Sequence, residues 1–133
     1  MEQLLNNLTS LLLYSNLAFH VRHFNAKTHA VHVVLQEAYE LCDSFADEVG
    51  EQYLAMYPGS KVSPNYYPAP GILRALSAQA DVEALETLIL HVVECRELLV
   101  HGGASEAIIN IIEARMSDLN KVLYRLRLAY GDL

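Results

Sequence analysis

The chain has 133 residues, of which 53% are hydrophobic, and it carries a formal net charge of −7. This size and composition predict one folded domain and exclude a chain that is disordered throughout. The acidic balance disfavours binding to nucleic-acid phosphates, because only a small basic cluster (Lys121, Arg125 and Arg127) lies near the C-terminus. The sequence contains no run of 18 apolar residues, so no membrane-spanning helix is predicted. The first residues lack the basic segment that begins a secretion signal. We therefore expect a soluble, cytoplasmic protein.

Apolar residues recur every three or four positions in four long segments, which is the spacing of amphipathic helices. We expect long helices over about residues 3–25, 28–56, 81–101 and 105–130. Val33 and Val100 belong to the predicted apolar faces of the second and third helices. The predicted N-caps are Thr28, Asp81 and Ser105, and the predicted stops are Gly102, Gly103 and Gly131.

Residues 57–71, YPGSKVSPNYYPAPG, contain all four prolines of the chain. Proline fixes φ and lacks a backbone N–H, so no long helix continues through this stretch. We predict a proline-rich crossover loop here, with a short helix over GILRALS after it. The expected fold class is all-α: residues 1–133 form a single ferritin-like four-helix bundle with one long crossover connection.

Several common kinds of chemistry are not supported by the sequence. Cys42 and Cys95 stand alone in helical contexts, so we expect reduced thiols and no disulfide framework. No GxSxG, Walker-type or GxGxxG motif is present. His91 and Glu94 are three residues apart on one helix, which offers too few ligands for a metal, and we interpret them as a surface patch.

Four of the six histidines lie in HVRHFNAKTHAVH, residues 20–32. His20 is near the end of the first helix and His32 near the start of the second, so antiparallel helices bring both to similar heights. Neutral imidazole is a common ligand for iron and zinc. His23 and His29 lie closer to the turn. Histidines at such a corner are also often polar surface residues or structural hydrogen-bonding groups, and the stretch alone leaves both interpretations open.

Asp47 and Glu51 form an acidic pair at a spacing of four on the second helix. Asp47 lies fifteen residues beyond His32, which leaves the two about 60° apart in rotation but about 22 Å apart along the axis. His32 and Asp47 of the same chain therefore cannot bind the same ion. A second copy of this helix, antiparallel across a two-fold axis, would place Asp47 and Glu51 of one copy opposite His20 and His32 of the other.

These four positions resemble the ferroxidase pattern of the Dps family, the miniature ferritins. That pattern is a His, a second His twelve residues later, an Asp fifteen after that and a Glu four further on. His20, His32, Asp47 and Glu51 match it without a gap. The segment DEVGE and the last helix, SEAIINIIEARMSDLNKVLYRLRLAYG, are also similar to the family.

The resemblance implies a homo-oligomer, commonly a dodecameric shell, whose minimal unit is a two-fold dimer. In the family, iron(II) is oxidised at sites shared between two subunits, often with hydrogen peroxide, and ferric iron is stored inside. The implied catalytic and metal-binding residues are thus His20, His32, Asp47 and Glu51, with Fe²⁺/Fe³⁺ or Zn²⁺ as the metal. Gln36, His23 and His29 are expected to support these ligands. Such ligands need neutral imidazoles, so binding should weaken in acid.

The chain departs from the family at two informative positions. The usual further carboxylate, four residues after the second histidine, is Gln36 here, and the tryptophan that often follows the first histidine is Val21. Gln36 removes one negative charge from the site. The alternative is therefore a non-catalytic Dps-like or ferritin-like oligomer with a degenerate ferroxidase site, which has a metal-binding, structural or interaction role. A helical adaptor without metal is the remaining alternative.

Overall fold

The computed structural model describes residues 1–63 and 70–131. Within these residues it contains five helices and no strand: α1 (Glu2–Phe24), α2 (His29–Met56), α3 (Pro70–Ala78), α4 (Asp81–His101) and α5 (Glu106–Tyr130). The all-α prediction is confirmed. The bounds of the four long helices differ from the expected ones by at most one residue at either end.

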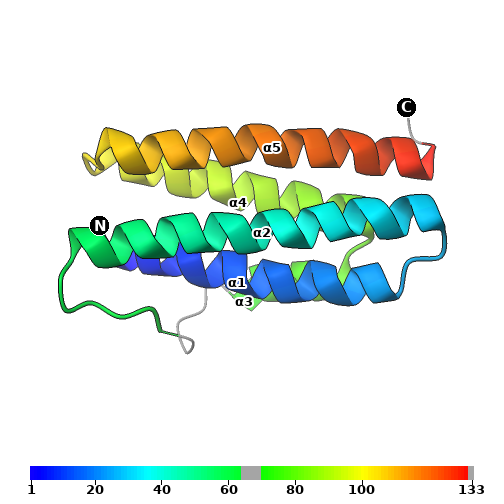
Figure 1. Cartoon of the computed structure of the whole chain (residues 1–133), viewed down its shortest axis with the longest axis horizontal. Helices are drawn as coiled ribbons and strands as arrows, with labels where there is room; N and C mark the ends of the chain where they lie inside the picture. The colour runs from blue at the N-terminus through cyan, green and yellow to red at the C-terminus, as the bar shows by residue number, and fades with distance from the viewer. Residues whose placement is uncertain (64–69, 132–133) are drawn as a thin grey trace.

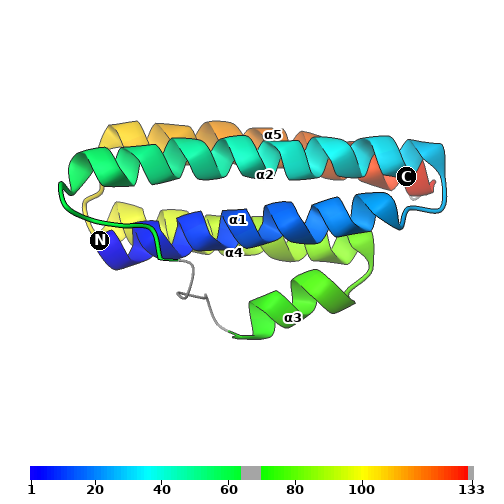
Figure 2. The same ribbon diagram turned by 60° about the horizontal axis from the view of Figure 1, so that its bottom comes forward.

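The directions of the helices follow from the contacts between them. Glu37 pairs with Arg125 and Glu48 with Arg115, so α2 and α5 are antiparallel. α4 and α5 are joined by a tight Gly-Gly turn and are also antiparallel (Figure 1). α2 and α4 consequently run parallel, and the connection between them, which contains α3, carries the chain along the bundle (Figure 2).

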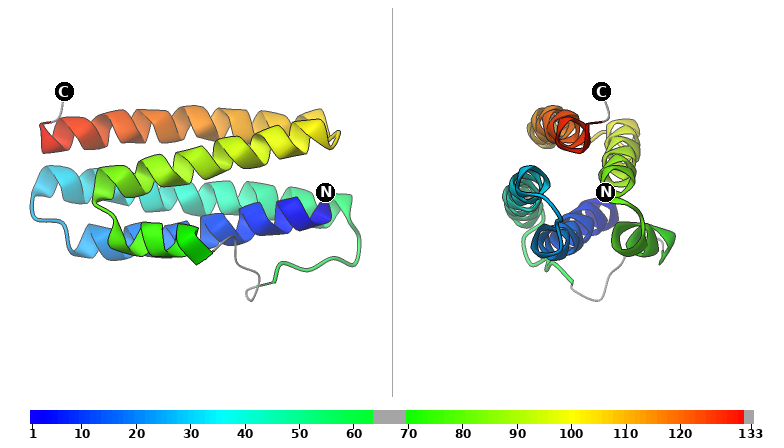
Figure 3. Two further views of the ribbon diagram at one scale, coloured as in Figure 1. Left: turned by 180° about the vertical axis from the view of Figure 1, so that it is seen from behind. Right: turned by 90° about the vertical axis from the view of Figure 1, so that its right-hand side faces the viewer.

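Seen end-on, the four long helices occupy the corners of a square in the order α1, α2, α5, α4, and α3 lies outside it against α1 and α4 (Figure 3). The core between them is formed by buried aliphatic and aromatic side chains, among them Leu8, Leu12, Phe19, Leu35, Phe45, Leu88, Val92, Ile112 and Leu126. The prediction that Val33 and Val100 lie in the core is wrong, since they are 40% and 48% exposed. The neighbouring helices cover only part of the apolar face of each helix, so apolar residues at the edges of that face remain exposed.

Some of the predicted helix ends are observed and one is wrong. The Thr28 hydroxyl accepts the backbone N–H of Val31 at 3.2 Å and caps α2, and Gly131 ends α5 with a φ of 76°. The N-cap of α4 is Ala80, not Asp81. The Asp81 carboxylate instead binds Arg22 and the hydroxyl of Tyr130. Ser105 occupies the N-cap position of α5 but makes no side-chain cap bond.

The first part of the crossover lies along α1. The Ser63 backbone N–H donates to Asn6 Oδ1 at 3.1 Å, and the Ser10 hydroxyl donates to the Ser63 carbonyl at 3.2 Å. These bonds give partners to two polar side chains that are largely buried in α1. The predicted loop over residues 57–71 is too long by two positions, since α3 begins at Pro70; residues 64–69 of that loop lie outside the described residues.

Candidate metal centre

The turn between α1 and α2 brings His23 and His32 into direct contact. Their rings stack with centroids 3.7 Å apart and an interplanar angle of 24°. The Nδ1 atom of each ring lies 2.8 Å from the backbone carbonyl oxygen of the other residue. Because a carbonyl oxygen only accepts hydrogen bonds, each Nδ1 carries the hydrogen, and Nε2 of the neutral ring keeps its lone pair. His32 therefore has the fixed orientation and tautomer of a typical metal-ligating histidine.

His20 is held by aromatic rings on two sides. Its ring stacks on Tyr39 of α2, with centroids 4.0 Å apart and planes 10° apart, and on Phe24, at 4.9 Å and 15°. It makes no hydrogen bond to any residue that the structure describes, and its imidazole is half-buried. Its orientation is therefore fixed by packing, while its ring nitrogens remain uncommitted.

The three predicted supporting residues differ in their surroundings. His23 is only 7% exposed and contacts both His32 and, at 6.0 Å between centroids, His20. His29 is exposed, and its ring centroid is 6.4 Å from that of His32. The exposed Gln36 amide donates to Glu40 Oε1 at 2.9 Å. His23 thus forms one group with His20 and His32, which we call the histidine cluster. His29 and Gln36 are exposed to solvent.

Asp47 and Glu51 lie on the same side of α2, towards its other end. Both are exposed, and both line a hollow of about 220 Å³ formed with Thr9 and Leu13 of α1. Neither forms an ion pair or side-chain hydrogen bond with any described residue. Within residues 1–63 and 70–131, no group of three or more His, Cys, Asp or Glu side chains of one chain could hold a metal ion. One copy therefore presents the histidine cluster and the acidic pair as two separate groups.

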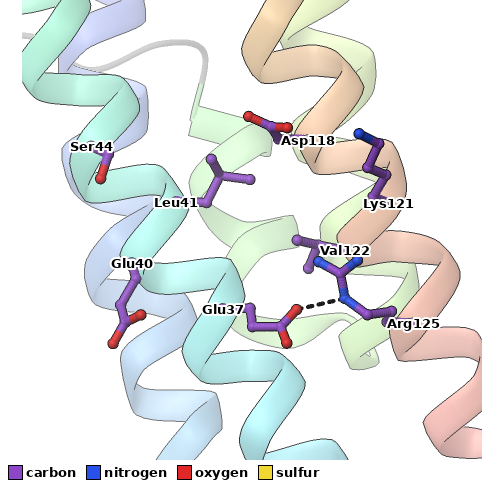
Figure 4. Close-up of a pocket in the computed structure, with 8 residues that line it drawn as sticks. All are labelled: Glu37, Glu40, Leu41, Ser44, Asp118, Lys121, Val122 and Arg125. Atoms are coloured by element: carbon purple, nitrogen blue, oxygen red, sulfur yellow. Dashed lines mark hydrogen bonds and ion pairs between the residues drawn. The ribbon is translucent and has the colours of Figure 1, made fainter.

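The remaining polar clusters are less suited to metal binding. A groove of about 320 Å³ between α2 and α5 has charges of both signs, and Arg125 Nε donates to Glu37 Oε2 at 2.6 Å across it (Figure 4). His91 and Glu94 form a pair on α4 at 3.1 Å, as expected of a surface patch.

The two cysteines are free thiols. Burial, together with the adjacent Asp43 carboxylate, raises the pKa of the Cys42 thiol to about 12. Burial and the charge of Glu94 raise the pKa of the Cys95 thiol to about 11. Both are protonated near neutral pH and are poor metal ligands or nucleophiles there.

Sequence reasoning missed the aromatic residues that hold His20. Phe24 lies four residues after His20 on the same helix, and this spacing was a detectable signal for a contact. Tyr39 reaches His20 from α2. Its contact depends on the vertical register of the two helices, which the sequence does not specify residue by residue.

Comparisons of the chain with models of protein families, with curated proteins and with solved structures find no match in any of the three. In the part of the chain that the structure describes, no helix has both the length and the apolar character that a membrane crossing requires. The functional interpretation therefore depends on the geometry of the residues described above.

Proposed function

We propose that this protein is a Dps-like, ferritin-like iron protein that oxidises Fe(II) at sites shared between two copies of the chain. His20 and His32 of one copy and Asp47 and Glu51 of the other would bind the iron. Ferric iron would be retained by the oligomer, which would limit oxidative damage. One observation carries the proposal: two uncommitted ligand groups lie at opposite ends of one outer face, and an apolar stripe lies between them.

The apolar stripe is on α1. Leu13, Leu17, Val21 and Phe24 follow one another at spacings of three and four, and each is between 46% and 72% exposed. A contiguous exposed apolar stripe is typical of a surface that another chain covers. Its position beside the histidines favours a partner that also completes the metal site.

The register between α1 and α2 supports a two-fold axis through the centre of this stripe. His23 is level with His32, and the Asn16 amide donates to the Tyr39 carbonyl at 2.8 Å. Leu17 is therefore level with Ala38, the neighbour of Tyr39, and this level is within about two residues of the midpoint between His32 and Asp47 along α2. A two-fold axis at this level brings the histidine end of α2 in one copy towards the acidic end of α2 in the other, with His32 about one turn from Asp47 along the axis, and it does so twice.

The bundle supports the ferritin-like part of the proposal. α2 and α4 run parallel and are joined by one long crossover, which is the connectivity of ferritin-like bundles. This architecture fixes α1 and α2 side by side, so the imidazoles need little reorganisation when iron binds.

The donor set fits iron as the substrate. Neutral imidazole nitrogens bind Fe(II), and carboxylates favour the more highly charged Fe(III) that forms when each iron gives one electron to hydrogen peroxide or oxygen. Zn²⁺ suits the same donors and would compete with Fe(II). The arginines Arg115, Arg125 and Arg127 of α5 each pair with a carboxylate of a neighbouring helix, so DNA binding is not part of this proposal.

A second candidate function is a non-catalytic metal-binding oligomer, and Gln36 is the observation that favours it. Its amide replaces a carboxylate and donates to Glu40 at 2.9 Å, so the site has a neutral group at this position. A site with one carboxylate fewer binds a second cation less strongly.

The test is aerobic addition of Fe(II) to the protein while ferric absorbance is followed. The double variant His32→Ala plus Asp47→Ala should lose the rate above background, whereas the matched pair His91→Ala plus Glu94→Ala on α4 should keep it. Mixing the single variants His32→Ala and Asp47→Ala should restore part of the activity. A hybrid dimer of the two contains one intact site. If wild type and the double variant both oxidise Fe(II) only at the background rate, ferroxidase activity is excluded. If wild type binds metal without oxidising it, the second candidate is favoured. If wild type takes up no metal, only a role as a helical interaction protein remains.

A further inference from the structure

The outer face of α1 and α2 carries one protruding aromatic side chain. Phe24 is 72% exposed, the largest fraction among the large hydrophobic side chains that the structure describes as exposed. Its ring stacks on His20 at 4.9 Å and contacts His23 edge-on at 5.5 Å between centroids. These contacts hold the phenyl ring beside the histidine cluster in a defined orientation, and most of its surface remains open to solvent.

The same face has a hollow near its other end, the one that Asp47 and Glu51 line. The hollow measures about 220 Å³, and its remaining walls are Thr9, Leu13, Ala46, Gly50, Leu54 and Val62. Gly50 contributes to the hollow by having no side chain, and a Cβ there would lie 3.2 Å from Thr9 Cγ2. An engineered apolar cavity of roughly 150 Å³ is large enough to bind benzene. The hollow is therefore large enough for a phenyl ring.

The protrusion and the hollow are at matching levels. A two-fold axis level with Leu17 places residue 24 of one copy opposite residue 10 of the other. Thr9 and Leu13, which line the hollow, lie on either side of that level. The phenyl ring and the hollow also both lie along the groove between α1 and α2, because Phe24 stacks on His20 and His20 stacks on Tyr39 of α2.

We infer that Phe24 of one copy inserts into the hollow of a second copy of the chain, so that each dimer contains two such contacts. This inference rests on the proposed shared site. Hydrogen-bonding complementarity supports the same partner, because a neutral His20 imidazole has one N–H to donate and no partner for it among the described residues, whereas the hollow is lined by the acceptor carboxylates of Asp47 and Glu51. Insertion brings the stacked His20 ring towards these carboxylates, so the phenyl ring sets the register of the metal site.

The first test is the dimer dissociation constant of Phe24→Ala, measured by sedimentation equilibrium. We expect it to rise by about a hundredfold or more, since two buried phenyl rings are lost from each dimer. The matched control is Leu90→Ala on the outer face of α4, where an exposed leucine lies away from the proposed interface. Its dissociation constant should stay within about threefold of wild type. Because Phe24 and Leu90 are both exposed, neither substitution removes a core side chain. Circular dichroism checks that the helices of both variants are intact.

The second test is cross-linking of mixed single-cysteine variants with a short bismaleimide. Phe24→Cys mixed with Leu13→Cys should give covalent dimers, because Leu13 is exposed, lines the hollow and lies within one turn of the level of Phe24 of the other copy. Phe24→Cys alone should not, because two copies of position 24 lie fourteen residues apart along the axis, about 21 Å. Cys42 and Cys95 have raised pKa values, so they react slowly with maleimide at neutral pH, and wild type measures that background.

These tests separate the inference from the proposed function. A cross-link from the mixture together with a weakened Phe24→Ala dimer supports the docking contact, even where wild type oxidises no iron and the proposed ferroxidase fails. An unchanged dissociation constant for Phe24→Ala, a mixture that cross-links no better than wild type, or a wild-type monomer overturns the inference. It does so even where iron is oxidised.

Discussion

The Arg22 side chain connects four helices, and replacing it with methionine is expected to destabilise the fold. Its Nη1 atom donates to Asp81 Oδ1 at 2.7 Å, and its Nε and Nη2 atoms donate to the Leu76 carbonyl at 3.2 and 2.8 Å. Asp81 also accepts from the hydroxyl of Tyr130. The ends of α1, α3 and α4 thus meet at one guanidinium group, and Tyr130 joins α5 to them through Asp81.

The size of the effect follows from the burial of the ion pair. The side chains of Arg22 and Asp81 are only 12% and 16% exposed. Arg22→Met leaves a largely buried carboxylate without its cation and the Leu76 carbonyl without its donors. Removing one partner of a fully buried pair costs about 3–5 kcal/mol, and the remaining exposure places this variant near the lower limit, at about 3 kcal/mol.

The control is Arg96→Met, which breaks a pair with Glu113 whose side chains are 33% and 48% exposed. Such a pair contributes about 0–1 kcal/mol. Urea unfolding followed by circular dichroism gives the free energy of unfolding of both variants and of wild type. Two losses that agree within about 1 kcal/mol would contradict the argument that burial, not ion pairing as such, makes Arg22 important.

Three further predictions concern the site, the thiols and the core. Gln36→Glu places a carboxylate near His32 and should raise the affinity for Fe(II), measured by anaerobic equilibrium dialysis, by about tenfold. An unchanged affinity would show that residue 36 does not contribute to the site. The raised pKa of Cys42 means that the unfolded chain releases this proton first as pH rises above 9, so the free energy of unfolding should fall between about pH 9 and 12. Urea titrations should show that Cys42→Ala lacks this contribution of up to about 1.4 kcal/mol per pH unit, and parallel curves would contradict it. Phe45→Ala removes a fully buried ring and should cost about 4 kcal/mol, whereas the exposed Phe24→Ala should cost less than about 0.5 kcal/mol in a dilute monomer; similar losses would contradict the burial assignment.

The helices could be predicted from the sequence because their signals are local. Apolar spacing, Thr28 and Gly131 act over one or two turns, and the observed helix ends agree with them closely. Asp81 shows the limit of this reasoning. It has the residue type of an N-cap, but its carboxylate binds Arg22 from a helix far away in the sequence, and this long-range contact decides its role.

The candidate site was predictable as residue types and spacing but not as packing. The spacing of the four proposed ligands means that only two copies of the chain together could place them around one ion. The sequence did not reveal that His23 and His32 exchange hydrogen bonds with each other's backbone, because this depends on the conformation of the turn between α1 and α2. This pairing engages Nδ1 of His32 and leaves Nε2 as the free nitrogen, which is what its proposed role as a ligand requires.

The distribution of arginines gives a further physical reason to expect a partner over the acidic end of α2. Arg115 and Arg125 of α5 neutralise Glu48 and Glu37 on the side of α2 that faces the bundle. On the outer side, Asp47 and Glu51 have no arginine or lysine within ion-pair distance among the described residues. Like charges at a spacing of four destabilise a helix slightly, so this pair has a cost that the isolated chain does not offset. A cation shared with the histidines of a second copy would offset it, and the same ion would then hold the two copies in register.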